Sequence, residues 1–427
     1  MITDTLDPLA LRQQFPALRR EVNGQAAVYL DGPGGTQVPQ AVIEAMSDFL
    51  RQGGSNLGGY FASSARSAAI EQSAREAMRD FYNARRAEEI IFGQNMTSLT
   101  FAFSRALART WQAGDEIVLT RLDHDGNISP WLLAAEERHV TVRWLDLRPE
   151  DCALALELLD DLLNERTQLL AITHASNAVG TIPDVQRAVR LAHEAGALVY
   201  VDAVHYAPHG LIDVQALDCD FLVSSSYKYF GPHTGILYGK HEHLQRLKAY
   251  KVRPAPQEPP GKWETGTQSF ESLAGVRAAV DYIAAIGAHT APEQNAAKAA
   301  TTNGGRRAKL ERAFARIKEH EMGLSQRFLE GATTVRGLRV YGITDVERLE
   351  QRAPTFAVSL QGQTPAEVAQ RLGEQGIFVW DGHYYALAVM ERLGLLDSGG
   401  LVRIGFVHYN TEEEVDRVLG ALRELAG

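Results

Sequence analysis

Short and almost uninterrupted apolar runs alternate along the chain with longer amphipathic stretches. The runs that predict buried strands are 89–92, 116–120, 140–144, 168–173, 197–201, 220–224 and 235–238. Strands that are buried on both faces lack the in-out alternation of half-exposed strands, and helical stretches between them are typical of βαβ units. The pattern therefore predicts an α/β fold whose large domain contains a mostly parallel seven-stranded sheet with helices on both faces.

The pattern changes after about residue 285. Residues 288–308 are small and polar, which predicts an exposed insertion or linker. A charged helix follows, and then apolar runs near 338–341, 355–359, 377–380 and 402–406 predict strands of a second sheet. A chain of 427 residues is long enough for more than one domain. We predict an N-terminal segment 1–25 that packs with the small domain, a large domain 26–285, and a smaller α+β C-terminal domain 286–427.

Composition excludes several classes of function. A formal net charge of −10 argues against nucleic acid and anionic membrane surfaces as partners. The two cysteines, Cys152 and Cys219, form no CxxC or His-rich spacing, so we expect neither a metal site nor a disulfide framework. The N-terminus lacks an apolar leader and no apolar run is long enough to span a bilayer, so we expect a cytoplasmic protein.

Two predicted strands are followed by ionisable side chains, one acidic and one basic. Asp202 directly follows the run 197–201, and Lys228 follows the run 220–224 after a cluster of hydroxyl side chains. Enzymes that use pyridoxal phosphate need a lysine for the Schiff base with the cofactor and an acid that keeps its pyridine nitrogen protonated. Taken singly, a solvated lysine and a helix-capping aspartate are the more ordinary interpretations. Together, beyond the carboxyl ends of neighbouring strands, they predict a pyridoxal phosphate site.

Other predicted loops add to this interpretation. Thr97 opens a helix after a strand, where it could bind a phosphate or simply cap the helix. His124 could stack on an aromatic ring and move protons, or be a solvated loop residue. Asn177 could hydrogen-bond a phenolic oxygen, or be tolerated in a turn before glycine. The glycines around Gly34 let the backbone approach a ligand closely.

Jointly, these motifs resemble those of the class V aminotransferase and cysteine desulfurase group of pyridoxal phosphate enzymes, which have fold type I. The resemblance extends from residues 29–31 to 409–411. It implies that Lys228 forms the Schiff base and acts as the general base, with His124 as a second catalytic residue. It also implies that the cofactor contacts Met96, Thr97, His124, Asn177, Asp202, Val204, His205, Ser225, Tyr227, Lys228 and Thr267.

In this group the position of Thr267 reaches the phosphate of a neighbouring subunit, which implies a homodimer with the active site at the subunit interface. The resemblance further implies that Arg403 clamps the α-carboxylate of an amino-acid substrate. The remaining substrate contacts that it implies are Gly34, Asn177, His383 and Tyr385.

The chain departs from cysteine desulfurases in the segment that carries their nucleophilic cysteine. Residues 381–386 read Asp-Gly-His-Tyr-Tyr-Ala, so Tyr385 stands where the cysteine would be. A phenol cannot accept sulfane sulfur as a thiolate does. Neither cysteine is a plausible substitute, because Cys219 starts a buried strand and Cys152 lies in a predicted helix far from any motif.

The resemblance to sulfur enzymes favours β-elimination from a sulfur-containing amino acid, a C–S lyase activity. Transamination of the class V type and amino-acid epimerisation remain open alternatives. A catalytically silent interaction protein is a more remote one, because both Lys228 and Asp202 are present.

Overall fold

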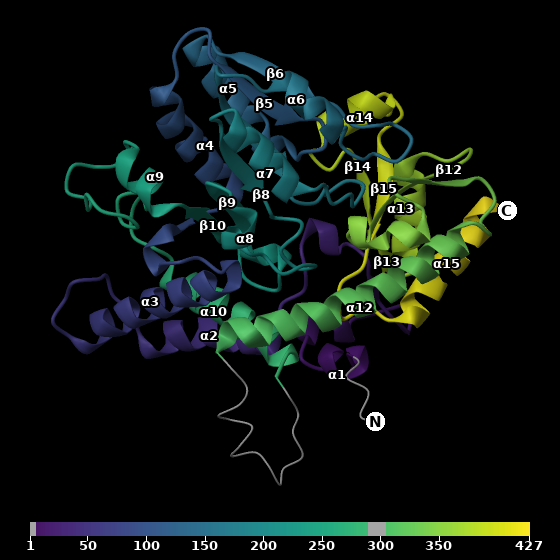
Figure 1. The fold of residues 1–427 in the computed structure, drawn as a ribbon. Coiled ribbons are helices and arrows are strands. Elements are labelled where there is room, and N and C mark those ends of the chain that lie inside the picture. The colour runs from purple at the N-terminus through teal and green to yellow at the C-terminus, as the bar shows by residue number, and fades with distance from the viewer. Residues whose placement is uncertain (1–5, 289–304) are drawn as a thin grey trace.

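The large sheet explains where the candidate residues meet. The computed structural model describes residues 6–288 and 305–427, and in that part of the chain seven strands pair in the order β4-β10-β9-β8-β7-β5-β6 (Figure 1). They are β4 (Ile90–Gly93), β5 (Glu116–Thr120), β6 (Thr141–Leu145), β7 (Thr167–Thr173), β8 (Leu198–Asp202), β9 (Phe221–Ser225) and β10 (Gly235–Gly239). Only β10 runs antiparallel to its neighbours, β4 and β9. The predicted mostly parallel sheet is confirmed.

The two faces of this sheet carry separate apolar clusters. Val118, Leu170 and Val201 belong to one cluster, whereas their neighbours Leu119 and Tyr200 belong to the other. This alternation follows from the strand geometry, in which successive side chains point to opposite faces. Helices α3, α7 and α10 pack on the first face, and α4 and α5 pack on the second. Apart from the edge strand β6, which is partly exposed, the strands are almost wholly buried because both faces are covered.

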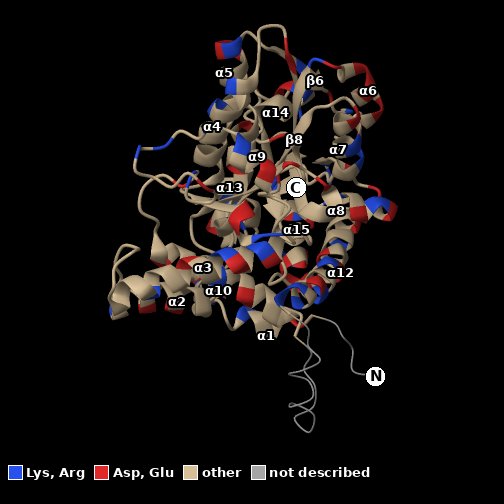
Figure 2. Cartoon of the chain, turned by 60° about the vertical axis from the view of Figure 1, so that its left-hand side comes forward, with Lys and Arg blue, Asp and Glu red and all other residues tan. Residues whose placement is uncertain are grey.

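The helices of this part of the chain have the following bounds: α2 (Gln40–Gln52), α3 (Ala62–Tyr82), α4 (Met96–Leu107), α5 (Ser129–Arg138), α6 (Leu159–Leu162), α7 (Val185–Glu194), α8 (Val214–Leu217), α9 (His241–Arg246) and α10 (Phe270–Ile286). In Figure 2, positions of both charges, Lys and Arg in blue and Asp and Glu in red, occur along several of the helices. Among the residues described, no helix is both long and apolar enough to cross a membrane.

A second, antiparallel sheet forms beside the large one. Its strands pair in the order β11-β12-β15-β14. The elements are β11 (Leu338–Tyr341), β12 (Thr355–Leu360), β14 (Trp380–Gly382), β15 (Leu401–Gly405), α12 (Arg306–Ala332), α13 (Pro365–Glu374), α14 (Leu387–Leu393) and α15 (Glu412–Ala426). Helix α12 runs from α10 beneath the large sheet to α15 at the small sheet (Figure 1). This arrangement is the predicted α+β region.

The single strand predicted over 377–380 is wrong. The chain forms two short strands there, β13 (Ile377–Phe378) and β14, and β13 pairs in parallel with β3 (Val28–Tyr29). Before β3 lie α1 (Pro8–Arg12), β1 (Glu21–Val22) and β2 (Gln25–Ala26). In this N-terminal stretch, Arg12 forms an ion pair with Glu414 of α15 at 2.8 Å. The three-part division of the chain stays a prediction, and most of the predicted insertion 288–308 lies outside the described residues.

Candidate active site

A cavity lies beyond the carboxyl ends of the large sheet's strands. Its lining residues are Asn95, Met96, Thr97, His124, Thr173, Ala175, Asn177, Asp202, Val204, His205, Ser225, Tyr227 and Lys228. The structure therefore brings together the residues that the sequence assigned to a cofactor, with the exception of Thr267. Asn95, Thr173 and Ala175 were missed, although Thr173 ends β7 in the position that Asp202 has on β8.

Lys228 and Asp202 face the same cavity from neighbouring strand ends. The Nζ atom of Lys228 donates to the carbonyl oxygen of Pro33 and lies 5.0 Å from the centre of the Tyr227 ring. The pKa of Lys228 is lowered to about 7, chiefly by desolvation and also by the charge of Arg403, while Asp202 opposes the shift. Desolvation raises the pKa of Asp202 to about 6, against the hydrogen bond that its Oδ1 accepts from the Val204 amide at 2.8 Å. An amine with this pKa is largely available as a nucleophile and base near neutral pH.

One end of the cavity is formed by the N-terminus of α4. The Asn95 side chain caps this helix by accepting a hydrogen bond from the Ser98 amide at 2.8 Å. The Met96 amide donates to the Ser225 hydroxyl at 3.0 Å, and Thr97 stands on the first turn. The positive end of the helix dipole favours an anionic group at this place.

His124 presents a neutral ring. Its Nδ1 accepts a hydrogen bond from the Gly126 amide at 2.9 Å, and its ring stacks on that of Tyr385 with centroids 5.6 Å apart. Desolvation, assisted by Lys228 and Arg403, lowers the pKa of His124 to about 4. The ring can thus stack on an aromatic ligand without carrying a charge at neutral pH.

The sequence also missed Asp123, which fixes the loop that carries His124. Its carboxylate accepts hydrogen bonds from Asn127 Nδ2 at 2.6 Å and from the Thr173 amide at 3.1 Å. Burial raises the pKa of Asp123 to about 8. The only signal for Asp123 in the sequence was its place directly before His124, which a second aspartate, Asp125, follows.

Arg403 lies on β15 and is not part of the cavity lining itself, but its charge acts on Lys228 and His124, which are. Its Nη1 donates to the Asn177 carbonyl at 2.8 Å, and its guanidinium lies 4.4 Å from the centre of the Tyr384 ring. Asn177 Nδ2 in turn donates to the Tyr384 carbonyl at 2.9 Å. Both Arg403 Nε and Asn177 Oδ1 are buried without a hydrogen-bond partner. Because such atoms are costly to leave unsatisfied, they indicate that this region is built for a polar ligand.

The other predicted substrate contacts, Gly34, His383 and Tyr385, do not line the cavity, although Tyr385 stacks on His124, which does. Gly34 packs against the indole of Trp380, where a Cβ atom would collide with it. His383 and Tyr385 stand in the loop after β14, and the Tyr385 side chain is exposed although its carbonyl accepts a hydrogen bond from the Asp125 amide at 2.6 Å. Tyr384 and Tyr385 both have left-handed backbone conformations, with φ of 54° and 57°. This geometry and these bonds fix the loop.

Thr267 is exposed and lies away from the cavity. The loop before it is anchored by Glu264, which pairs with Arg75 at 2.8 Å and accepts a hydrogen bond from the Phe92 amide at 2.8 Å. Within this chain, Thr267 therefore contributes nothing to the lining.

The donors, acids and rings of the cavity fit pyridoxal phosphate. The α4 N-terminus suits its phosphate, Asp202 suits its pyridine nitrogen, and the buried Asn177 Oδ1 offers an acceptor for its hydroxyl. His205 is also placed here, and its Nε2 is 2.9 Å from the Thr355 hydroxyl. Within the described residues, no group of three or more His, Cys, Asp or Glu side chains could hold a metal ion.

Both cysteines are buried away from this cavity. Burial raises the pKa of the Cys152 thiol to about 11, and it also raises the pKa of Cys219. The predicted helix around Cys152 is wrong, because this residue has a φ of 52° in a turn. A left-handed residue of this kind is typical of turns rather than helices.

Comparisons with known proteins agree with this geometry. Residues 28–306 and 308–418 match the family described as Aminotransferase class-V. A cysteine desulfurase from Serratia proteamaculans is 32% identical over 430 residues, which cover 97% of each chain. The fold is similar to that of a cysteine desulfurase from Escherichia coli, with a TM-score of 0.81, 27% identity and 98% of each chain covered. It is also similar to that of the apo cysteine desulfurase from Thermococcus onnurineus NA1, with a TM-score of 0.83, 26% identity, and 96% of this chain and 98% of that chain covered.

Proposed function

Because the chain belongs to the class V aminotransferase family, a family of pyridoxal phosphate-dependent enzymes, we propose that it is a cysteine desulfurase-like C–S lyase. It would eliminate the sulfur substituent from the β-carbon of an amino acid. The observation that carries this choice is the tyrosine at position 385, where the resemblance to desulfurases places their nucleophilic cysteine. Without a thiolate at this place, sulfur has no acceptor on the protein and leaves as sulfide.

The residues of the cavity have separate tasks in holding the cofactor. The Met96 amide, Thr97, Ser225 and Tyr227 hold the phosphate, and His124 stacks on the ring. Further contacts to the cofactor are Asp202 at the pyridine nitrogen, Val204 beneath the ring, and Asn177 and His205 at the hydroxyl oxygen. When bound, pyridoxal phosphate supplies an electron sink that makes the α-proton of the substrate acidic.

Lys228 is the residue that moves this proton. Its pKa of about 7 leaves about half of the amine neutral at pH 7, so it can take the α-proton without a second base. The protonated amine can then return the proton to the departing sulfur. The C–S bond breaks with its electron pair on sulfur, which leaves as hydrogen sulfide, and water converts the remaining fragment to an oxo acid and ammonia.

Arg403 binds the α-carboxylate of the substrate. Its Nε has no partner and its charge persists, although burial lowers its pKa to about 10. Gly34 and Asn177 complete this side of the site. His383 and Tyr385 contact the part of the substrate that leaves; this placement is supported by the stacking of Tyr385 on His124, which lines the cavity.

The product balance tests the proposal. The cofactor-loaded protein is incubated with cysteine and with a panel of other amino acids, and pyruvate, ammonia, sulfide, alanine and protein-bound sulfane sulfur are measured. Equal amounts of pyruvate, ammonia and sulfide from cysteine are expected. Alanine with protein-bound sulfane sulfur would mean desulfurase chemistry, and an oxo acid without sulfide would mean transamination.

The working assembly in this proposal is a homodimer in which Thr267 reaches the phosphate bound by the partner subunit. Support comes from the exposure of Thr267 and of three apolar residues before α3, Leu57, Tyr60 and Phe61. Light scattering should give twice the chain mass of 46.9 kDa. A monomer that is fully active would contradict the assembly but leave the reaction untouched.

A further inference from the structure

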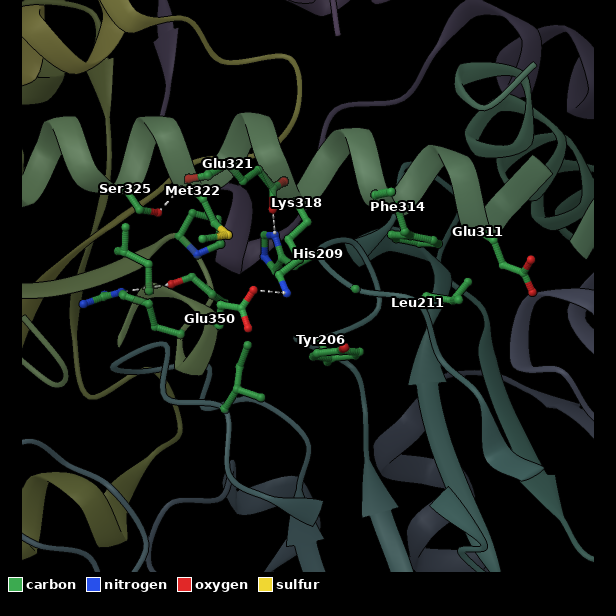
Figure 3. Close-up of a pocket in the computed structure, with 17 residues that line it drawn as sticks. Tyr206, His209, Leu211, Glu311, Phe314, Lys318, Glu321, Met322, Ser325 and Glu350 are labelled. Carbon is green, nitrogen blue, oxygen red and sulfur yellow. Dashed lines mark hydrogen bonds and ion pairs between the residues drawn. The ribbon is translucent and has the colours of Figure 1, made fainter. Parts of the chain in front are cut away.

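A second cavity lies between helix α12 and the loop after β8 that also carries His205 of the active cavity (Figure 3). His205 lines the active cavity, whereas His209, four residues later, lines the second one. The complete lining is Ile182, Tyr206, His209, Gly210, Leu211, Glu311, Phe314, Ala315, Lys318, Glu321, Met322, Ser325, Leu349, Glu350, Arg352, Ala353 and Pro354. None of these residues belongs to the lining of the active cavity.

One wall is a single face of α12. Glu311, Phe314, Lys318, Glu321 and Ser325 follow one another at intervals of three or four residues, so their side chains lie on one side of the helix. Figure 3 shows Phe314 and Lys318 on this helix, with Tyr206 and Leu211 across the cavity. The cavity is thus enclosed between elements that are about 100 residues apart in the sequence.

The polar centre of the cavity is Glu321. Its side chain is only 4% exposed, and its Oε2 lies 2.9 Å from Nδ1 of His209. Its Oε1 is buried and has no hydrogen-bond partner. A buried carboxylate oxygen without a donor is costly, and an N–H group of a bound cation would satisfy it with a charge-assisted bond.

The opposite wall offers an aromatic face. The Tyr206 ring is stacked on the His174 ring, with centroids 3.7 Å apart and planes 12° apart. His174 holds Tyr206 on one side, and Tyr206 lines the cavity on the other. Phe314 and Met322 add apolar surface. A ring face held in this way attracts an ammonium ion, and this cation–π interaction is strongest where water is excluded. The same face can also pack against an apolar ring.

An ion pair spans part of the cavity. Lys318 Nζ lies 3.1 Å from Glu350 Oε1, and the two side chains are 49% and 72% exposed. Exposed pairs of this kind contribute about 0–1 kcal/mol, so this one opens readily to admit a ligand. The carboxylates of Glu311, Glu321 and Glu350 outnumber Lys318 around this space. Arg352, the other cation of the lining, donates to backbone carbonyls of Ile343, Ala353 and Thr355.

We propose that this cavity binds a small organic ammonium ion with an apolar body. The N–H group donates to Glu321 Oε1, and the body packs between Tyr206 and Phe314. This site goes beyond the proposed function, because it uses none of the residues that hold pyridoxal phosphate or the amino-acid substrate. Its failure would leave the C–S lyase assignment as it stands.

The probe for this site is the N,N-dimethylbenzylammonium ion, a tertiary amine that cannot form a Schiff base with an aldehyde. Isothermal titration calorimetry of the cofactor-loaded protein should give saturable binding at one site. Glu321→Gln should weaken this binding at least about tenfold, because it removes the charge-assisted bond. The matched control is Glu319→Gln, a charge change at an exposed position of α12 outside the lining, which should leave binding unchanged.

Two further variants test whether the probe occupies the second cavity. Ala315→Trp, at an exposed position of the rim, should block the probe while leaving the melting temperature unchanged, which covers the case that Glu321→Gln fails to fold. Lys228→Ala should bind the probe like the native protein. The proposal is overturned if the probe does not bind, if it binds Ala315→Trp like the native protein, or if Lys228→Ala loses it, since the last result would place the probe in the active cavity.

Discussion

The amine of Lys228 should titrate more than three pH units below an ordinary lysine. Its pKa is about 7 instead of the usual 10.5, chiefly because of desolvation, with Arg403 lowering it further and Asp202 raising it. At pH 7 about half of the amine is then neutral, compared with roughly one molecule in three thousand for an unperturbed lysine. The two neighbouring charges supply variants with opposite expected effects. Arg403→Met removes a cation and should raise the pKa of Lys228, whereas Asp202→Asn removes an anion and should lower it.

The assay is competitive labelling of the cofactor-free protein with a trace of acetic anhydride between pH 5 and pH 11. Mass spectrometry of the Lys228 peptide gives the fraction labelled at each pH, and the peptide with the exposed Lys248 serves as an internal reference for the reagent. The cofactor is left out because it would occupy the amine. Labelling of Lys228 should rise with a midpoint near pH 7 in the native protein.

A native midpoint above about pH 9 would show that the cavity does not desolvate the amine and would refute the reasoning. A shift in the same direction for both variants would show that the local charges do not act as assigned. Either result would also remove the basis for Lys228 as a base at neutral pH.

Further outcomes follow from the same site. Lys228→Ala should abolish turnover with an unchanged melting temperature, and residual turnover above background would exclude Lys228 as the base. Arg403→Lys should raise KM for an amino acid roughly 10- to 150-fold, since a charged hydrogen bond contributes about 1.5–3 kcal/mol, and it should leave KM for the corresponding amino amide unchanged. An equal KM for native protein and variant would contradict the carboxylate clamp. Tyr385→Cys should form no protein-bound sulfane sulfur, because the backbone hydrogen bond from the Asp125 amide to the carbonyl of residue 385 still fixes the loop, and detection of such sulfur by cyanolysis would refute this.

The large sheet could be predicted because its strands, apart from the edge strand β6, are buried on both faces. Such strands are short apolar runs in the sequence, and β5 lies at the predicted residues 116–120. The candidate cofactor residues could be predicted from the same strand pattern, since side chains after the carboxyl ends of parallel strands meet at one edge of the sheet. Their joint placement in one cavity depended on this topology and not on any single motif.

Other features depend on contacts that no local pattern reveals. The run 377–380 was predicted as one strand, but β13 pairs with β3 from the other end of the chain, and β14 pairs with β15. The contact of Glu321 with His209 joins residues that are 112 positions apart. The turn at Cys152 was missed because residues 152–162 contain enough leucine and alanine to suggest a helix.

The antiparallel course of β10 has a consequence for the reacting lysine. Residues 226–234 form a short hairpin between β9 and β10, and the Ser226 amide donates to the Thr234 carbonyl at 2.9 Å while Gly231 donates to the Ser226 carbonyl at 2.9 Å. A lysine on such a cross-braced turn has its backbone held at both ends. The amine can therefore move from one reacting atom to the next only by rotation about its side-chain torsions. The length of the lysine side chain thus limits which bonds this enzyme can break.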